Sequence, residues 1–136
     1  MPDSWHHGAV AKLLSLFSTQ ILATFLGTAG VAHFVVPDQF NPLIPPWLPG
    51  SATFYTYISG VAEIAIAVGL LTPRTRRLTA WAAALLFVAV YPGNIYMAYD
   101  WRDRELSQQL VAYLRLPLQI PLIWWAVSIA RKTPRQ

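Results

Sequence analysis

The sequence predicts an all-α protein, a bundle of four transmembrane helices joined by short loops. The 136-residue chain is 55% hydrophobic but only 12% charged, whereas soluble domains carry about 25% charged residues. Four segments are predominantly apolar over about 20 residues, the length that crosses a bilayer, and most charged residues lie outside them. These observations argue against a soluble enzyme, a disordered protein and a nucleic-acid-binding domain, so no nucleic-acid partner is expected.

The four predicted helices leave room for one membrane domain, residues 1–136, and nothing more. The first predicted helix follows Lys12, and the alternative is a cleaved signal peptide. Its apolar run is longer than the roughly 7–15 residues of such a peptide, which favours a retained helix. The predicted helices are residues 13–36, 53–71, 78–99 and 109–130.

A proline-rich stretch, PDQFNPLIPPWLPG at residues 37–50, joins the first two predicted helices. Each proline removes a backbone donor and disfavours helix before it. The stretch is apolar, but irregular backbone cannot face lipid at depth because its polar groups would be unpaired. We therefore expect it to lie at the outer interface, or to form a lid over the mouth of the bundle, with these lid residues: Phe34, Pro37, Phe40, Pro46 and Trp47.

The basic residues predict the orientation, because cytoplasmic loops carry an excess of Lys and Arg. The two tails and the second loop hold seven of them, whereas the third loop holds two, Arg102 and Arg104. Both termini should therefore be cytoplasmic. The seven are Lys12, Arg74, Arg76, Arg77, Arg131, Lys132 and Arg135.

Five polar residues lie inside the predicted helices: His33, Glu63, Asn94, Arg115 and Gln119. Ionisable side chains within a bilayer are costly, and they usually face the bundle interior or a cavity. A rise of about 1.5 Å per residue puts all five in the outer half or near the midplane. Because every helix supplies at least one of them at a compatible depth, we expect them to form one ligand-binding pocket that opens outward.

Each of these residues also has a simpler interpretation. Glu63 and Arg115 would pair, either within a pocket or only to fix the bundle, and Glu63 alone would be protonated. Arg115 would otherwise extend toward the lipid headgroups. His33 would cap the end of its helix, and Asn94 would hydrogen-bond between helices.

Several classes of site find no support in the sequence. There is no cysteine, and no nucleotide-binding or zinc-protease motif occurs, so no metal site is expected. Haem is disfavoured because His33 is the one histidine within the predicted helices. No cofactor is certain, although a quinone or a lipid would fit a membrane pocket.

Four stretches of the chain, in this order and spacing, carry a resemblance to a known family. They are AGVAHFVVPDQFNPLIPPWLP, YISGVAEIAIAVGLLTPRTRRLTAWA, VYPGNIYMA and RLPLQIPLIWWA. Over nearly its whole length the chain resembles the DoxX-like family of small bacterial integral membrane proteins. The resemblance implies a four-helix bundle in the bacterial inner membrane. The pattern positions it implies are His33, Phe34, Pro37, Phe40, Pro46, Gly60, Glu63, Pro92, Asn94, Arg115, Pro117 and Gln119.

The resemblance also bears on function. Some relatives are linked to thiosulfate:quinone oxidoreductase subunits and others to redox-stress membrane complexes, and the fold looks like that of the EXPERA-type sterol isomerases. Relatives that work with thiols need cysteines, so direct thiol–disulfide chemistry is in doubt for this chain.

The leading hypothesis is a pocket that binds a small amphiphile, a quinone or an isoprenoid, or a membrane subunit of a redox-associated complex. The alternatives are an EXPERA-like isomerase that uses Glu63 and His33, a purely structural membrane anchor, and a transporter, although no internal repeat supports the last. The expected partners are the lipid bilayer, a protein of a redox complex and a second copy of the chain.

Overall fold

The computed structural model describes the backbone of residues 3–135 and the side chains of residues 7–135. The prediction of an all-α bundle is confirmed, since this part of the chain contains helices and no strand. Four apolar spans are long enough to cross a membrane, so the protein is a multi-pass membrane protein. The elements are α1 (Asp3–Val35), α2 (Pro37–Phe40), the 3₁₀ turn η1 (Asn41–Leu43), α3 (Ala52–Leu71), α4 (Arg76–Ala89), α5 (Tyr91–Asp100) and α6 (Leu106–Lys132).

The observed helices differ from the predicted ones mainly at two places. Helix α1 begins at Asp3, ten residues before the predicted start, because the polar N-terminal residues continue the helix beyond the apolar run. The third span is not one continuous helix over 78–99 but α4 and α5, which are separated at Val90. Pro92, near the start of α5, has no N–H to continue the hydrogen-bond ladder, which explains the break.

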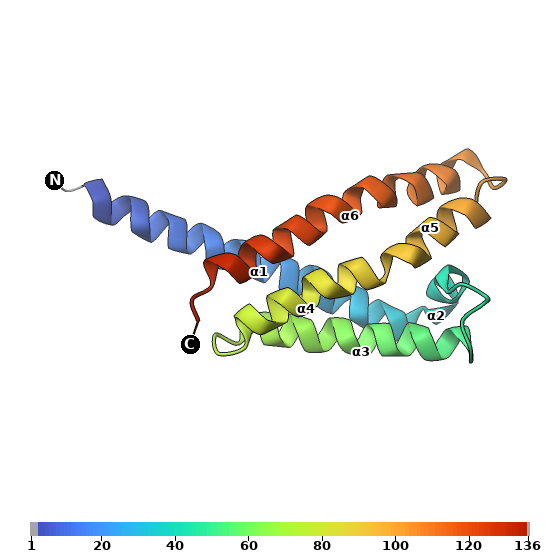
Figure 1. Ribbon diagram of the computed structural model, residues 1–136, viewed down its shortest axis with the longest axis horizontal. Coiled ribbons are helices and arrows are strands. Elements are labelled where there is room, and N and C mark those ends of the chain that lie inside the picture. The colour runs from blue at the N-terminus through green and yellow to red at the C-terminus, as the bar shows by residue number, and fades with distance from the viewer. Residues whose placement is uncertain (1–2, 136) are drawn as a thin grey trace.

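Helix α1 packs along α3, and α4 packs along both α3 and α6 (Figure 1). Two glycines allow the first contact. A Cβ atom on Gly30 would lie 2.9 Å from the Gly60 carbonyl oxygen, and one on Gly60 would lie 2.9 Å from the Gly30 carbonyl oxygen. Small residues are the usual means by which membrane helices approach so closely. This contact brings the last turns of α1 against the middle of α3.

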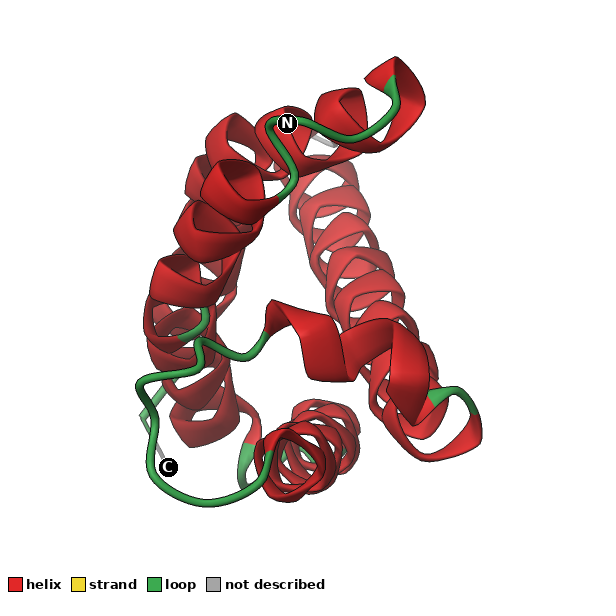
Figure 2. Ribbon diagram, turned by 90° about the vertical axis from the view of Figure 1, so that its right-hand side faces the viewer, coloured by secondary structure: helices red, strands yellow, loops and turns green. Residues whose placement is uncertain are grey.

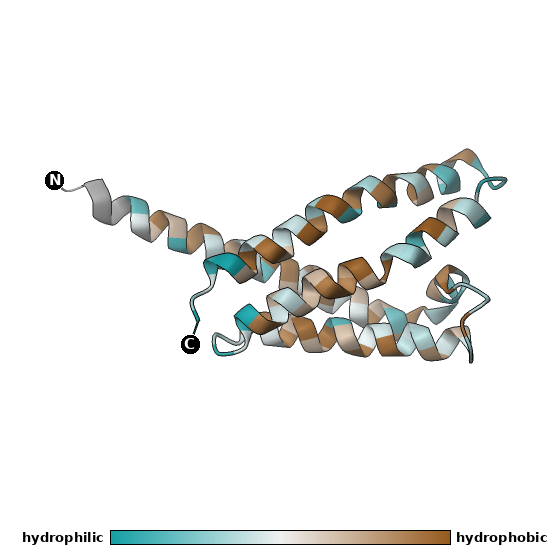
Figure 3. Ribbon diagram, in the orientation of Figure 1, coloured by the Kyte–Doolittle hydropathy of each residue, from teal (hydrophilic) through white to brown (hydrophobic). Residues whose placement is uncertain are grey.

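The two ends of the bundle differ in what they carry (Figure 1). One end, called here the terminal end, carries both chain termini and the turn at 72–75. The other, called the loop end, carries residues 36–51 and the α5–α6 connection at 101–105. Hydrophilic residues gather mostly at these turns, and apolar residues run along all four spans (Figure 3). The outward apolar faces are suited to contact with lipid.

Residues 36–51 form neither a spanning helix nor a wholly irregular loop. They fold into α2 and η1 and then pass through a turn at 45–48 and a bend at Gly50 to the start of α3. These short helices lie across the interior at the loop end (Figure 2). The η1 turn packs against both α3 and α5, two helices that do not pack against each other. The segment thus fills the gap between the α1–α3 pair and the α5–α6 pair.

Candidate functional site

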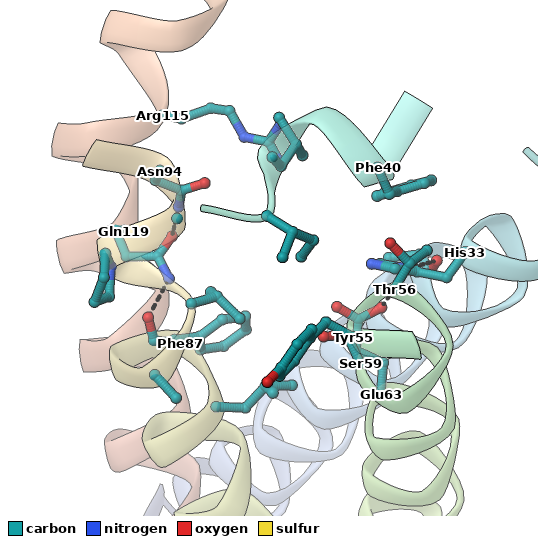
Figure 4. Close-up of a pocket in the computed structure, with 18 of the residues that line it drawn as sticks. His33, Phe40, Tyr55, Thr56, Ser59, Glu63, Phe87, Asn94, Arg115 and Gln119 are labelled. Atoms are coloured by element: carbon teal, nitrogen blue, oxygen red, sulfur yellow. Dashed lines mark hydrogen bonds and ion pairs between the residues drawn. The ribbon is translucent and has the colours of Figure 1, made fainter. Parts of the chain in front are cut away.

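A cavity of about 630 Å³ lies beneath residues 36–51, between the α1–α3 pair and the helices α4, α5 and α6. All five polar residues singled out in the sequence line it, although they come from four different helices (Figure 4). The volume is typical of small-molecule sites, which span about 300–1,000 Å³. The sequence prediction that these residues gather at one pocket therefore matches the geometry, and what the pocket binds stays a prediction.

His33 and Glu63 form one wall of the cavity (Figure 4). The His33 Nδ1 atom lies 3.3 Å from the Glu63 Oε2 atom, and both side chains are largely buried. The ring of His33 also stacks on that of Phe40, with 3.9 Å between the ring centroids. The close approach of α1 and α3 at Gly30 and Gly60 makes this pair possible, because a larger side chain there would separate the helices.

The direction of the hydrogen on His33 Nδ1 decides whether His33 donates to Glu63 or to the backbone. His33 Nδ1 also lies 2.7 Å from the Ala29 carbonyl oxygen, which accepts a hydrogen bond only if Nδ1 carries the proton. When Nδ1–H is directed at Ala29, the buried Oε2 of Glu63 has no hydrogen-bond partner. A buried acceptor without a donor costs about 1–3 kcal/mol. On this wall of the cavity, Glu63 Oε2 therefore lacks one hydrogen-bond donor.

The opposite wall is a chain of neutral hydrogen bonds. The Asn94 amide donates to Gln119 Oε1 at 3.2 Å, and Gln119 Nε2 donates to the Phe87 carbonyl oxygen at 2.5 Å. Asn94 follows the break between α4 and α5, and Gln119 lies on α6 between Pro117 and Pro121. The expectation of interhelical bonding by Asn94 matches this geometry, which ties α6 to the last turn of α4.

Arg115 lines the cavity but does not pair with Glu63, so the predicted Glu63–Arg115 ion pair is wrong. Its Nη1 atom instead donates to the sulfur of Met97 at 3.8 Å, which is a weak acceptor. Figure 4 shows the cause, since the two residues stand on opposite sides of the cavity. Within the described residues, Arg115 faces the cavity without a carboxylate in contact.

Two of the five predicted lid residues lie at the cavity. Phe40 and Trp47 line the cavity, but Phe34, Pro37 and Pro46 do not. Phe34 stacks on Tyr57 of α3 outside the cavity, Pro37 begins α2, and Pro46 is exposed to solvent or lipid. The buried proline of the segment is its neighbour, Pro45, which lines the cavity and begins a turn closed by a hydrogen bond from the Leu48 N–H to the Pro45 carbonyl oxygen at 3.1 Å.

Sequence reasoning missed the residues that fasten residues 36–51 over the cavity. The Thr56 hydroxyl donates to Asn41 Oδ1 at 2.8 Å, and the Asn41 amide donates to Thr53 Oγ1 at 3.2 Å. Thr56 also lines the cavity, together with Tyr55 and Ser59. The signal was present, since Thr56 precedes Glu63 by seven residues and so lies on the same face of α3.

The cavity thus offers a carboxylate and an imidazole on one wall and a cation with two amides on the other (Figure 4). Most of its remaining lining is apolar, from aliphatic and aromatic side chains. Within residues 7–135 no three His, Asp or Glu side chains gather to hold a metal ion. The arrangement suits an organic molecule that has a polar end and an apolar body.

Comparison with known proteins identifies a family for the chain and no individual relative. No curated protein and no solved structure matches the chain. Residues 22–130 match the family described as Domain of unknown function (DUF8561), and this match covers every residue that lines the cavity and the whole or part of each of the four spans. Because the match extends over more than half of the sequence, the chain belongs to the DUF8561 family.

Proposed function

We propose that this protein binds a small amphiphile, a quinone or an isoprenoid, in the cavity at the loop end of the bundle. The observation that carries the proposal is that two charged residues, Glu63 and Arg115, line a cavity of about 630 Å³ within an apolar bundle without full hydrogen-bond partners. Arg115 has a thioether as its hydrogen-bond acceptor and Glu63 has a buried oxygen without a donor. Such groups are costly unless a ligand pairs them.

The polar head of the ligand would lie between the two walls. An oxygen of the head would accept from the Arg115 guanidinium, and a hydroxyl or a protonated oxygen would donate to Glu63. The apolar body would fill the cavity among Leu26, Phe87 and Leu122, which line its deeper part. A head with acceptor and donor on opposite sides matches the two walls better than a simple anion, which Glu63 would repel.

We further propose, in line with the resemblance to the DoxX-like family, that the bundle lies in the bacterial inner membrane with both termini cytoplasmic. The seven basic residues of the tails and second loop all belong to the terminal end, and the positive-inside tendency then directs that end to the cytoplasm. The cavity would accordingly face the outer half of the bilayer. A redox-associated protein partner or a second copy of the chain would contact the exposed apolar faces.

The proposal is tested by purifying the protein without removing native lipids and identifying retained molecules by native mass spectrometry. Decyl-benzohydroquinone, the reduced form of the quinone, and farnesol are then titrated in nanodiscs, because each carries a hydroxyl that can donate to Glu63 and an oxygen that can accept from Arg115. Glu63→Gln and Arg115→Ala should each lower affinity about tenfold or more, because hydrogen bonds to charged groups contribute about 1.5–3 kcal/mol.

The controls are Glu105→Gln and Arg104→Ala, the same two changes at exposed positions of the loop end. Unchanged affinity in correctly folded Glu63→Gln and Arg115→Ala proteins would contradict the proposal. Retention of no small molecule together with no titratable binding would favour a structural subunit instead.

An isomerase is the second candidate, and one observation favours it. His33 and Glu63 converge at 3.3 Å on the cavity wall, within reach of a molecule bound there. A positioned acid and base of this kind can move a proton along an unsaturated chain. The test is the conversion of a β,γ-unsaturated ketone to its conjugated isomer, followed by ultraviolet absorbance. Activity that survives both Glu63→Gln and His33→Ala would exclude this chemistry.

A purely structural anchor is less well supported. That hypothesis expects the five polar residues to pack against one another without a cavity, whereas the cavity separates them into two walls.

A further inference from the structure

The cavity has a polar end and an apolar end. The lining residues of α1 and α6 show the direction from one end to the other. On α1 the lining residues Phe25, Ala29 and His33 follow one another at intervals of four, which is one face of a helix. On α6 Leu122, Leu118 and Arg115 form the corresponding series, and the fourth lining residue, Gln119, is bonded to Asn94 and to the Phe87 carbonyl oxygen. Both faces run from apolar side chains near the middle of the bundle to a polar group toward the loop end.

The apolar end of the cavity is open to the side. Phe25 and Leu118 line the cavity and are nevertheless 47% and 57% exposed on the outer surface. Each therefore contributes both to the cavity wall and to the apolar outer surface of the bundle. The Trp125 indole donates to the Ser18 hydroxyl at 2.6 Å, which joins α1 and α6 nearer the terminal end. From that contact the two helices diverge toward the loop end (Figure 1).

A second hollow continues this path on the outer face of α1. It is lined by Phe17, Gln20, Ile21, Thr24 and Phe25, so it shares Phe25 with the cavity. All five residues belong to one helix, and the hollow therefore has the width of a single helix face. A groove of that width accommodates one extended hydrocarbon chain.

We propose that the ligand is a single-chain amphiphile whose tail leaves the cavity between α1 and α6 and lies along this groove of α1. The inference rests on the proposed function and adds the ligand's class and its route. The head remains between the two polar walls, and the tail passes Phe25 and Leu118 into the hydrocarbon region. The ligand therefore enters sideways from the bilayer. Residues 36–51 are not its entrance but its cover, because Asn41 fastens them to Thr56 of α3.

The test uses the full chain in nanodiscs and a hexadecyl alcohol that carries a photoreactive diazirine in the middle of its tail. Crosslinked residues are mapped by peptide mass spectrometry, with and without an excess of unlabelled hexadecanol. Labelling that the excess suppresses reports a saturable site, whereas unsuppressed labelling reports ordinary contact with lipid. The expected result is suppressed labelling on residues 17–25 of α1 and at Leu118 and Leu122 of α6.

Variants locate the route independently. Leu118→Trp narrows the gap between α1 and α6 and should remove most of the suppressed labelling on residues 17–25. Leu85→Trp is the matched control, because Leu85 of α4 is 69% exposed and does not line the cavity. If Leu118→Trp does not fold, the labelling map of the unmodified chain still decides the route.

The outcomes separate the route from the function on which it rests. Suppressed labelling that maps to residues 36–51 or α5, and is lost in Arg115→Ala, overturns the lateral route and leaves the binding function standing. Suppressed labelling on residues 17–25 that persists in Leu118→Trp also overturns the route between α1 and α6. Absence of any suppressed labelling, with the quinone probe or farnesol still binding in the titration, overturns the proposed route and leaves the binding function standing. Absence of both suppressed labelling and titratable binding overturns the binding function as well.

Discussion

The half of the bundle nearer the terminal end is dense and apolar, whereas the half nearer the loop end encloses a cavity with polar walls. In the dense half, small side chains allow the helices to touch. Ala80 and Ala83 of α4 are fully buried, as are Ala126 and Ala130 of α6. Alanines at such spacing are typical of close membrane-helix packing.

The half with the cavity is built differently, since its helices are held apart. The apolar cluster between α5 and α6 there is small, with Met97, Ala98 and Ala112 as its buried members. The α1–α3 pair stands on the far side, and η1 bridges the distance. The half nearer the terminal end therefore stabilises the bundle through close helix contacts. The half nearer the loop end has fewer such contacts and leaves space in which polar groups can face a ligand.

The largest expected effect is a stability loss from the dense half. Leu70 is 0% exposed, so Leu70→Ala should destabilise the protein by about 2–5 kcal/mol through the hole it leaves. Leu118→Ala, at the open side of the cavity, should change stability far less because its surroundings are already unfilled. Unfolding measured by steric trapping in bicelles compares the two. Equal losses would mean that the halves are packed alike.

The next effect concerns the contact of α1 with α3. A Cβ atom on Gly30 would lie 2.8 Å from Ile64 Cγ1 and 2.9 Å from the Gly60 carbonyl, so Gly30→Ala should cost about 1–3 kcal/mol. Gly27→Ala is the control one turn away, where the added atom meets Ala67 at an ordinary 3.5 Å. Thermal unfolding in detergent measures the stability of both variants. Ligand affinity reports whether the His33–Glu63 side of the cavity is preserved in each. A harmless Gly30→Ala would show that the helices are not held at this distance.

The neutral wall gives a third comparison. Gln119→Leu removes the donor to the Phe87 carbonyl and the acceptor for Asn94, which should cost about 1–3 kcal/mol. Gln20→Leu places the same substitution on the exposed face of α1, where no buried partner is lost, and should be near neutral. Chemical unfolding of the two variants distinguishes them. A loss in Gln20→Leu equal to that in Gln119→Leu would contradict a specific role for the wall.

The smallest effect separates two neighbouring prolines. Pro45 is buried at the cavity and Pro46 is exposed. Pro46→Ala should leave stability within about 0.5 kcal/mol, as is usual for surface changes. Pro45→Ala should loosen residues 36–51, which limited proteolysis or hydrogen exchange would detect as faster cleavage or exchange. Faster cleavage or exchange in Pro46→Ala than in Pro45→Ala would mean that Pro46, and not Pro45, holds residues 36–51 against the cavity.

Much of the fold followed from composition and span length. Apolar runs of about 20 residues predict spanning helices because the bilayer leaves few other ways to pair the backbone. The extra turns of α1 and the break at Val90 were not predicted, since polar residues can continue a helix outside the apolar run and the site of a proline break depends on its neighbours. The five cavity residues were identified because polar groups are rare within spans.

What the sequence by itself determined is therefore which residues are costly in a membrane: His33, Glu63, Asn94, Arg115 and Gln119. What only the tertiary structure decided is how they pair. Glu63 meets His33 because two glycines bring α1 against α3, and Arg115 is kept from Glu63 because α6 and α3 stand on opposite sides of the cavity. Depth along a helix follows from counting residues, whereas the rotation and separation of helices follow from small contacts between distant parts of the chain.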